Sequence, residues 1–149
     1  MPVSITQALD IIYKNTSVVN SEVIPIEMAL GRVMSEDSIA TFDLPRFDNS
    51  AMDGYAVKCA DANSTVECTD VIYAGDDPKM TLQATKAIKI MTGAPIPKGC
   101  EAVIPIENTT VNGTQVTLPK EIKKDGHIRH AGENIKSGHI YLHKGEKVT

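Results

Sequence analysis

The chain has 149 residues, of which 42% are apolar and 4% aromatic with no tryptophan, so it can form one domain or two small ones around an aliphatic core. Its formal net charge of −4 argues against a general nucleic-acid binder, which normally presents a basic face, but does not exclude a small anionic ligand. The three cysteines include no C-x-x-C pair, which argues against a zinc site or a disulfide framework.

The N-terminal segment predicts a short amphipathic helix. Ser4 can cap it, with Gln7 completing a capping box, and apolar residues follow at helical spacing as far as Ile12. The segment lacks a basic region followed by a continuous apolar stretch, so it is not a signal peptide. No window reaches the ~18 apolar residues of a membrane span. We therefore expect a soluble, cytoplasmic protein without a membrane partner.

The next segment, "EVIPIEMALGRVMSEDSI", predicts a strand, a short helical turn over residues 27–30, a stop at Gly31 and a second strand. After Leu44, short β-type segments alternate with turns at residues 55–57, 66–73, 87–91, 102–106 and 115–118. Asn112 and Gly113 predict a hairpin with a type I′ turn. We expect a compact all-β module here. The chain turns β-like again from His139 and ends at Thr149 without a closing element, as a longer protein that has been cut would.

The stretch "LPRFDNSAMDGYAV" combines loop-forming residues with two carboxylates, Asp48 and Asp53. As turn residues, Asp48 would hydrogen-bond to the backbone that follows it and Asp53 would form a reverse turn with Gly54. Asn49 and Ser50 add side-chain donors that two turns do not require. The sequence alone leaves both interpretations open, a tight turn or a polar site.

A second candidate follows the strand that ends near Met91. Thr92 and Gly93 offer a hydroxyl and exposed backbone N–H groups, which suit a bound oxyanion. The alternative is a strand-end turn made rigid by the two prolines that follow. If Asp53 and Thr92 met, the carboxylate would repel an oxyanion, unless a divalent cation were present or Asp53 acted on water.

The third candidate is "GHIRHAGENIKSG". Arg129 can contact a phosphate or carboxylate with both arms of its guanidinium, or it can form a structural pair with Glu133 or an aspartate. These two interpretations are equally balanced. The histidines have no metal-ligand spacing, so solvated or structural roles are expected for them.

Three stretches, "FDNSAMDGYAV", "IMTGAPIPKGCEAVIPIE" and "IRHAGENIKSG", resemble in order and spacing the N-terminal region of the molybdopterin molybdenumtransferase family, the bacterial MoeA type. The E domain of gephyrin and the plant molybdenum insertase belong to the same family. The resemblance covers roughly residues 3–149. It implies insertion of molybdate into the dithiolene of adenylylated molybdopterin (molybdopterin-AMP), with Mg²⁺ as cofactor and AMP as a product.

The resemblance also implies an architecture. We expect a mainly β chain with a short N-terminal helix, in which a β-rich domain is inserted into a smaller mixed α/β domain. Residues 1–20 would hold the helix, residues 21–39 and 139–149 the small linking domain, and residues 40–138 the inserted domain. The pterin-binding and C-terminal domains would be absent. The implied partners are those domains and a second subunit, with a molybdopterin adenylyltransferase as a further candidate.

Carried over residue by residue, the resemblance implies catalytic roles for Asp53 and Thr92, and it makes Asp53 a candidate metal ligand. The implied substrate-binding residues are Asp48, Asn49, Ser50, Gly93, Glu107 and Arg129. Asn134 departs from the aspartate that many members have after Gly-Glu, which puts a charge role at that position in doubt. The alternative function is a non-catalytic β-rich binding or scaffold module, which would not need a carboxylate and a hydroxyl in one cleft.

Overall fold

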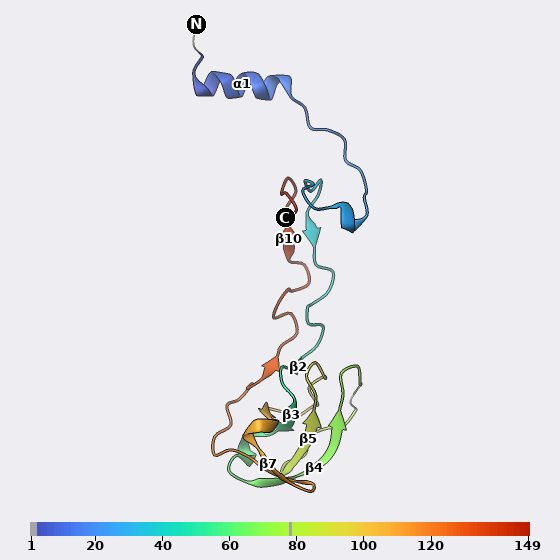
Figure 1. Cartoon of the computed structure of the whole chain (residues 1–149), viewed down its shortest axis with the longest axis vertical. Coiled ribbons are helices and arrows are strands. Elements are labelled where there is room, and N and C mark those ends of the chain that lie inside the picture. The colour runs from blue at the N-terminus through green and yellow to red at the C-terminus, as the bar shows by residue number, and fades with distance from the viewer. Residues whose placement is uncertain (1–2, 78) are drawn as a thin grey trace. The chain divides into compact units, whose positions relative to one another are not determined.

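The computed structural model describes residues 3–77 and 79–149 (Figure 1). The chain is mainly β, with a single α-helix, α1 (Ile5–Asn15), among the described residues, so this part of the expected fold class is confirmed. It divides into two compact units. One contains the residues up to Ser38 together with Tyr141–Thr149, and the other is Ile39–Ile140. The insertion of one domain into another remains a prediction.

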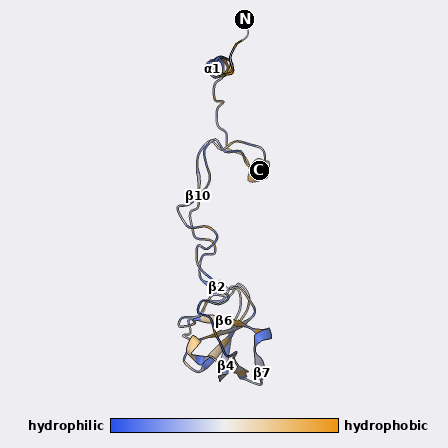
Figure 2. Ribbon diagram, turned by 90° about the vertical axis from the view of Figure 1, so that its left-hand side faces the viewer, coloured by the Kyte–Doolittle hydropathy of each residue, from blue (hydrophilic) through white to orange (hydrophobic). Residues whose placement is uncertain are grey.

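Helix α1 begins as its sequence predicts. The Ser4 hydroxyl accepts a hydrogen bond from the Gln7 N–H at 3.2 Å, and the Ser4 N–H donates to the Gln7 side chain at 2.9 Å. Figure 2 shows the helix nearly end-on, with hydrophilic and hydrophobic sides. None of its residues is buried. Over the ranges that the structure covers, no helix has the length and apolar character needed to cross a membrane.

One expectation for the segment after α1 is wrong. The strand predicted before the helical turn does not form, because residues 21–25 have no neighbouring strand to bond with and Val23 is fully exposed. The turn is a 3₁₀ helix, η1 (Ile26–Met28), and the chain reverses at Gly31, whose φ is +81°. The second strand is short, and β1 (Ser38–Ile39) pairs with β10 (Ile140–Leu142).

The second unit is built on a six-stranded sheet with the order β6-β3-β5-β4-β8-β7. Its pairs are antiparallel except β4 with β5, which is parallel. Every β segment predicted between Leu44 and Leu118 corresponds to an observed strand, and its first and last residues differ from those of the strand by at most one position. The strands are β3 (Gly54–Val57), β4 (Thr65–Ile72), β5 (Lys86–Ile90), β6 (Ala102–Pro105), β7 (Thr110–Asn112) and β8 (Gln115–Thr117).

Both faces of this sheet are covered, because alternate residues of the central strands enter two separate hydrophobic clusters. Tyr55 and Val57 belong to one cluster, and Ala56 between them belongs to the other. All four residues of β3 and of β6 are therefore buried. This packing makes β3 and its neighbours a rigid base for the residues that precede and follow them.

The predicted β7–β8 hairpin is confirmed, but its turn is not the expected one. Asn112 pairs with Gln115, so the two central residues are Gly113 and Thr114 rather than Asn112 and Gly113. Only Gly113 of these two has a positive φ, at +63°. A glycine with positive φ in the first central position is typical of a type II′ turn, which matches the strand twist as well as type I′ does.

A two-residue strand pair was not predicted. Strand β2 (Asn49–Ser50) pairs with β9 (Ile128–Arg129), with Asn49 opposite Arg129. Segments this short carry no periodic signal in the sequence. The pairing brings the polar loop before β3 next to the third candidate segment.

Candidate functional site

Asp53 and Thr92 are in direct contact. Asp53 immediately precedes β3, and Thr92 lies two residues beyond the end of β5. The antiparallel pairing of Gly54 with Ile90 brings these two strand ends together. One carboxylate oxygen of Asp53, Oδ1, accepts hydrogen bonds from the Thr92 N–H at 2.7 Å and the Thr92 hydroxyl at 2.6 Å. The two residues to which the resemblance assigns catalysis thus form one exposed unit, and their catalytic role remains a prediction.

Gly54 has a different function from the one expected. Its φ is not positive, and it opens strand β3 instead of forming a reverse turn with Asp53. A Cβ at this position would lie 2.1 Å from the carbonyl oxygen of Ile104 in β6. Glycine is therefore required because two backbones approach closely here. This close approach fixes the start of β3, and with it the place of Asp53.

The Asp53 carboxylate is ionised at neutral pH. Hydrogen bonds from the Thr92 hydroxyl, and then from the Thr92 N–H, lower its pKa below the ordinary value, and the positive charge of Lys89 adds a smaller effect. A carboxylate with a lowered pKa is a weak proton acceptor near neutral pH. The geometry therefore favours an electrostatic or hydrogen-bond-accepting function for Asp53 over that of a general base.

The backbone N–H groups of Thr92 and Gly93 are not free, which corrects the expectation of an oxyanion-binding corner. The Thr92 N–H is bonded to Asp53, and the Gly93 N–H donates to the Ser50 carbonyl at 2.8 Å. What remains is a second carboxylate oxygen on Asp53 and the acceptor capacity of the Thr92 hydroxyl. Such a corner suits a hydrogen-bond donor, a water molecule or a cation, and it repels a bare oxyanion.

Asn49 and Ser50 are buried. The Asn49 amide donates to the Phe47 carbonyl at 3.2 Å, and the Ser50 hydroxyl donates to the Met52 carbonyl at 2.6 Å. Both side chains thus hold the loop before Asp53. Their assignment as substrate-binding residues remains a prediction.

Asp48 does not form the local turn that was one of its two interpretations. Its Oδ1 accepts the Ala131 N–H at 2.8 Å, and its Oδ2 lies 3.1 Å from His130 Nδ1. The Ala131 N–H, and then His130, lower the pKa of Asp48, while the hydrogen bond and charge of Asp48 raise the pKa of His130. Asp48 therefore connects the loop before Asp53 with the third candidate segment.

Asp48→Asn is expected to lower the pKa of His130 toward its ordinary value. The asparagine oxygen can still accept the Ala131 N–H, so the loop should remain closed, but the negative charge that favours the imidazolium is lost. An NMR titration of the four histidines measures this directly. His127 is the internal control, because among the described residues the Asp48 side chain is hydrogen-bonded to His130 and Ala131 and not to His127. An unchanged His130 titration would contradict the proposed interaction.

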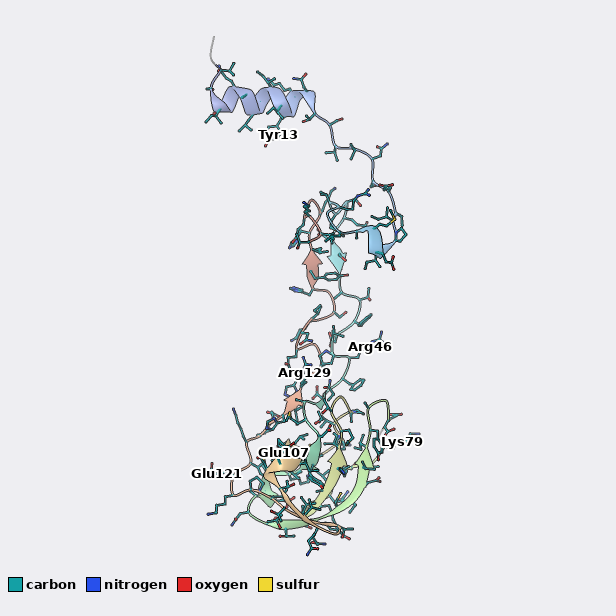
Figure 3. All side chains as sticks on the ribbon, viewed as in Figure 1. Tyr13, Arg46, Lys79, Glu107, Glu121 and Arg129 are labelled. Carbon is teal, nitrogen blue, oxygen red and sulfur yellow. The ribbon has the colours of Figure 1, made fainter. Side chains whose placement is uncertain are left out.

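Arg129 interacts with Asn134 and Glu133. This is the structural one of the two functions that its sequence context allowed. Its terminal nitrogen donates to the Asn134 side-chain oxygen at 2.7 Å, and its Nε lies 3.7 Å from a Glu133 carboxylate oxygen. Asn134 therefore serves as a neutral acceptor for Arg129. Figure 3 labels Arg129 and Glu107 among the side chains. A substrate contact by Arg129 remains a prediction.

Glu107 lies in the 3₁₀ helix η3 (Ile106–Asn108) and is exposed. The preceding residue, Ile106, donates its N–H to the Asp53 carbonyl at 3.1 Å. This places Glu107 one residue from the backbone around Asp53, but its own function remains a prediction.

The expected Mg²⁺ would find few ligands in this chain. Across residues 3–77 and 79–149, no group of three or more His, Cys, Asp or Glu side chains could hold a metal ion. Asp53 has one carboxylate oxygen that Thr92 leaves unoccupied. Mg²⁺ is commonly held by one or two carboxylates together with water and substrate phosphates. Asp53 fits the place of one such ligand, and the others would have to come from water, substrate or another part of the protein.

The structure also contains a groove of about 970 Å³ that was not predicted from the sequence. Its lining includes Val103 and Ile104 of β6 and the basic residues Lys123 and Lys124. Acidic residues, Glu121 and Asp125, line it as well, so it has no strong net charge. Asp53 and Thr92 are not among its lining residues.

Comparison with known proteins identifies the family. The family described as the MoeA N-terminal region, comprising domains I and II, matches residues 3–149. This chain belongs to that family. The molybdopterin molybdenumtransferase of Staphylococcus epidermidis strain RP62A is 37% identical over 99% of this chain and 37% of its own length. Molybdopterin molybdenumtransferase 2 of Mycobacterium tuberculosis strain H37Rv is 39% identical over 85% of the chain and 33% of its own length.

A solved MoeA structure has the same fold. The molybdopterin biosynthesis MoeA protein of Pyrococcus horikoshii OT3 superposes with a TM-score of 0.86 at 32% identity, covering 93% of this chain and 39% of its own. The expected resemblance to the MoeA family is thereby confirmed. The chain spans little more than a third of the length of the relatives it matches, so their complete activity is a matter of proposal here.

Proposed function

We propose that this chain is the N-terminal part of a molybdopterin molybdenumtransferase and contributes the Asp53–Thr92 unit to its active site. The observation that carries the proposal is the pair of hydrogen bonds, 2.7 and 2.6 Å, by which Thr92 fixes an exposed, ionised Asp53 at the end of a rigid sheet. Further support comes from the relatives in S. epidermidis and M. tuberculosis, which are molybdopterin molybdenumtransferases. A scaffold module would need no such unit.

Asp53 acts, in this proposal, on a part of the reaction other than the molybdate oxyanion. Its negative charge would repel molybdate, and the N–H groups beside it are already bonded. Its free oxygen can accept a hydrogen bond from substrate or from water and hold it in a fixed orientation. When bound, Mg²⁺ would supply positive charge that offsets the negative charge of the nucleotide phosphate. Thr92 holds Asp53 in place, and Lys89 helps to keep it ionised by lowering its pKa.

The remaining components of the site are proposed to lie outside this chain. A pterin-binding domain and a C-terminal domain would complete the protein, since the matched region is only 37% of the S. epidermidis relative. We further propose that residues 40–138 form a domain inserted between residues 21–39 and 139–149, and that a second subunit faces Asp53. Molybdopterin-AMP and molybdate are the proposed substrates.

A chimera tests this function. In it, this chain replaces the matched N-terminal 37% of the S. epidermidis enzyme, and insertion of molybdate into molybdopterin-AMP is measured. We expect the chimera to insert molybdate and the 149-residue chain alone to give no turnover, because the proposed pterin and nucleotide surfaces are elsewhere. A folded chimera without activity would contradict the proposal, and so would molybdopterin-dependent turnover by the chain alone.

A further inference from the structure

Ser50 connects the two sides of the Asp53–Thr92 unit through its main chain. Its N–H donates to the Ala94 carbonyl at 2.9 Å, and its carbonyl accepts the Gly93 N–H at 2.8 Å. These two bonds fasten the residues directly after Thr92 to the loop that leads to Asp53. An alanine at this position can make both bonds, since neither involves the side chain.

The Ser50 side chain acts on the other member of the unit. Its hydroxyl donates to the Met52 carbonyl at 2.6 Å and accepts the Met52 N–H at 3.3 Å. Both polar groups of the residue before Asp53 are thus bonded to one hydroxyl. Ser50 is 1% exposed, so no substrate can reach it, whereas the apolar Met52 is 39% exposed. The buried Ser50 hydroxyl therefore fixes the backbone of the exposed Met52. Because Asp53 follows Met52 directly, this also fixes the orientation of the Asp53 backbone.

We propose that Ser50 is the positioning residue that keeps the Asp53 carboxylate aligned with Thr92. Its main chain fixes the Thr92 side, and its hydroxyl fixes the peptide from which Asp53 extends. Ser50 contacts no substrate in this proposal, unlike the substrate-binding function that the family resemblance implies for it. The structural half concerns this chain alone. The catalytic half rests on the proposed function, because a misplacement of about 1 Å can cost a reaction about 10²-fold in rate.

The structural half is tested in the 149-residue chain by NMR-detected amide exchange. Ser50→Ala should raise the exchange rate of the Thr92 amide about tenfold or more, while amides of β3 and β5 keep their protection, because only a local opening has become easier. Ser50→Thr, which retains the hydroxyl, should restore slow exchange at Thr92. The matched control is Ser64→Ala, which removes a similar bond of 2.5 Å from a serine hydroxyl to the Asp61 carbonyl in a different loop.

Unchanged exchange at Thr92 in Ser50→Ala would overturn the proposal, as would an equal increase in Ser64→Ala. A general loss of protection throughout the sheet in Ser50→Ala, with no excess at Thr92, would also overturn it, since the hydroxyl would then stabilise the whole fold. These outcomes do not depend on any enzymatic activity, so they stand even if the proposed function fails.

The catalytic half is tested in the chimera. Ser50→Ala should lower kcat about 10- to 100-fold with KM nearly unchanged, because alignment is lost while the substrate contacts remain. Ser50→Thr should recover most of kcat, and Ser64→Ala should leave it unaltered. A raised KM with normal kcat would instead identify Ser50 as a binding residue and contradict the positioning function. If Ser50→Ala speeds exchange at Thr92 as expected but leaves kcat unchanged, Ser50 aligns Asp53 without contributing to catalysis, and the catalytic half of the proposal is wrong.

Discussion

Gly54→Ala is expected to be strongly destabilising, with a cost of about 3 kcal/mol or more, at the upper end of what overpacking of a core typically produces. The added Cβ would lie 2.1 Å from the Ile104 carbonyl oxygen, 2.8 Å from the Ile104 carbonyl carbon and 3.1 Å from the Pro105 Cα. All three are backbone atoms, so no side-chain rotation can relieve the contact. Strands β3 and β6 would have to separate where Gly54 pairs with Pro105.

Thermal unfolding measures this effect, and we expect the melting temperature to fall by about 10 °C or more. Gly113→Ala is the control for backbone conformation. Gly113 has φ of +63° but nothing within 4 Å of its added Cβ, so its substitution should cost only the left-handed penalty of about 1–2 kcal/mol. Equal melting temperatures for the two variants would show that β6 yields to the added methyl group, contrary to the packing described.

The sequence predicted those parts of the fold that depend on neighbouring residues. The capping box of Ser4 and Gln7 is a local interaction, and it places the start of α1 correctly. The strands predicted for the large sheet were located to within one residue at each end because they are short segments rich in β-forming residues and bounded by turn residues. The hairpin at Gly113 was found for the same reason, although its turn begins one residue later than expected.

The parts that were not predicted depend on segments far apart in the chain. The donor to the Asp48 carboxylate is the Ala131 N–H, 83 positions away in the chain, so the local pattern around Asp48 suggested a turn that does not form. Gly54 next to Asp53 has the composition of a reverse turn, but the reason for its glycine lies in β6. The N–H groups of Thr92 and Gly93 were expected to be free, because the sequence does not show that Asp53 and Ser50 accept them.

Family resemblance added information that these patterns lack. It predicted that Asp53 and Thr92 belong to one site. In the structure, the Thr92 hydroxyl oxygen lies 2.6 Å from Oδ1 of Asp53. The resemblance did not indicate how the contact is made. Only the structure shows that Thr92 donates both its N–H and its hydroxyl to one oxygen of Asp53 and leaves the other oxygen available.

Asp53→Asn in the chimera is expected to reduce molybdate insertion by about 10²-fold or more while leaving the fold intact. Removal of one preorganised electrostatic group from an active site typically costs about 10²–10³-fold in kcat. The asparagine oxygen can still accept both hydrogen bonds from Thr92, so the geometry of the loop should persist. What is lost is the negative charge, which the lowered pKa of Asp53 keeps present at neutral pH.

A matched control separates charge from structure. Asp43 is another aspartate that accepts a backbone N–H, from Ser137 at 2.8 Å; it is half-buried and lies in the same unit but outside the Asp53–Thr92 contact. Asp43→Asn should leave insertion unchanged. Both variants are to be compared by melting temperature and by single-turnover insertion on the same preparations, so that the folded fraction is known for each.

Thr92→Val completes the test, because it removes the hydroxyl but retains the backbone N–H. The pKa of Asp53 should then rise toward its ordinary value, since the hydroxyl is the largest cause of its lowering. Insertion should fall less than in Asp53→Asn near neutral pH, where the carboxylate is still ionised, and it should be lost sooner as the pH is lowered. If Asp53→Asn inserts molybdate normally and only its melting temperature falls, the carboxylate has a structural function and the proposed site is wrong.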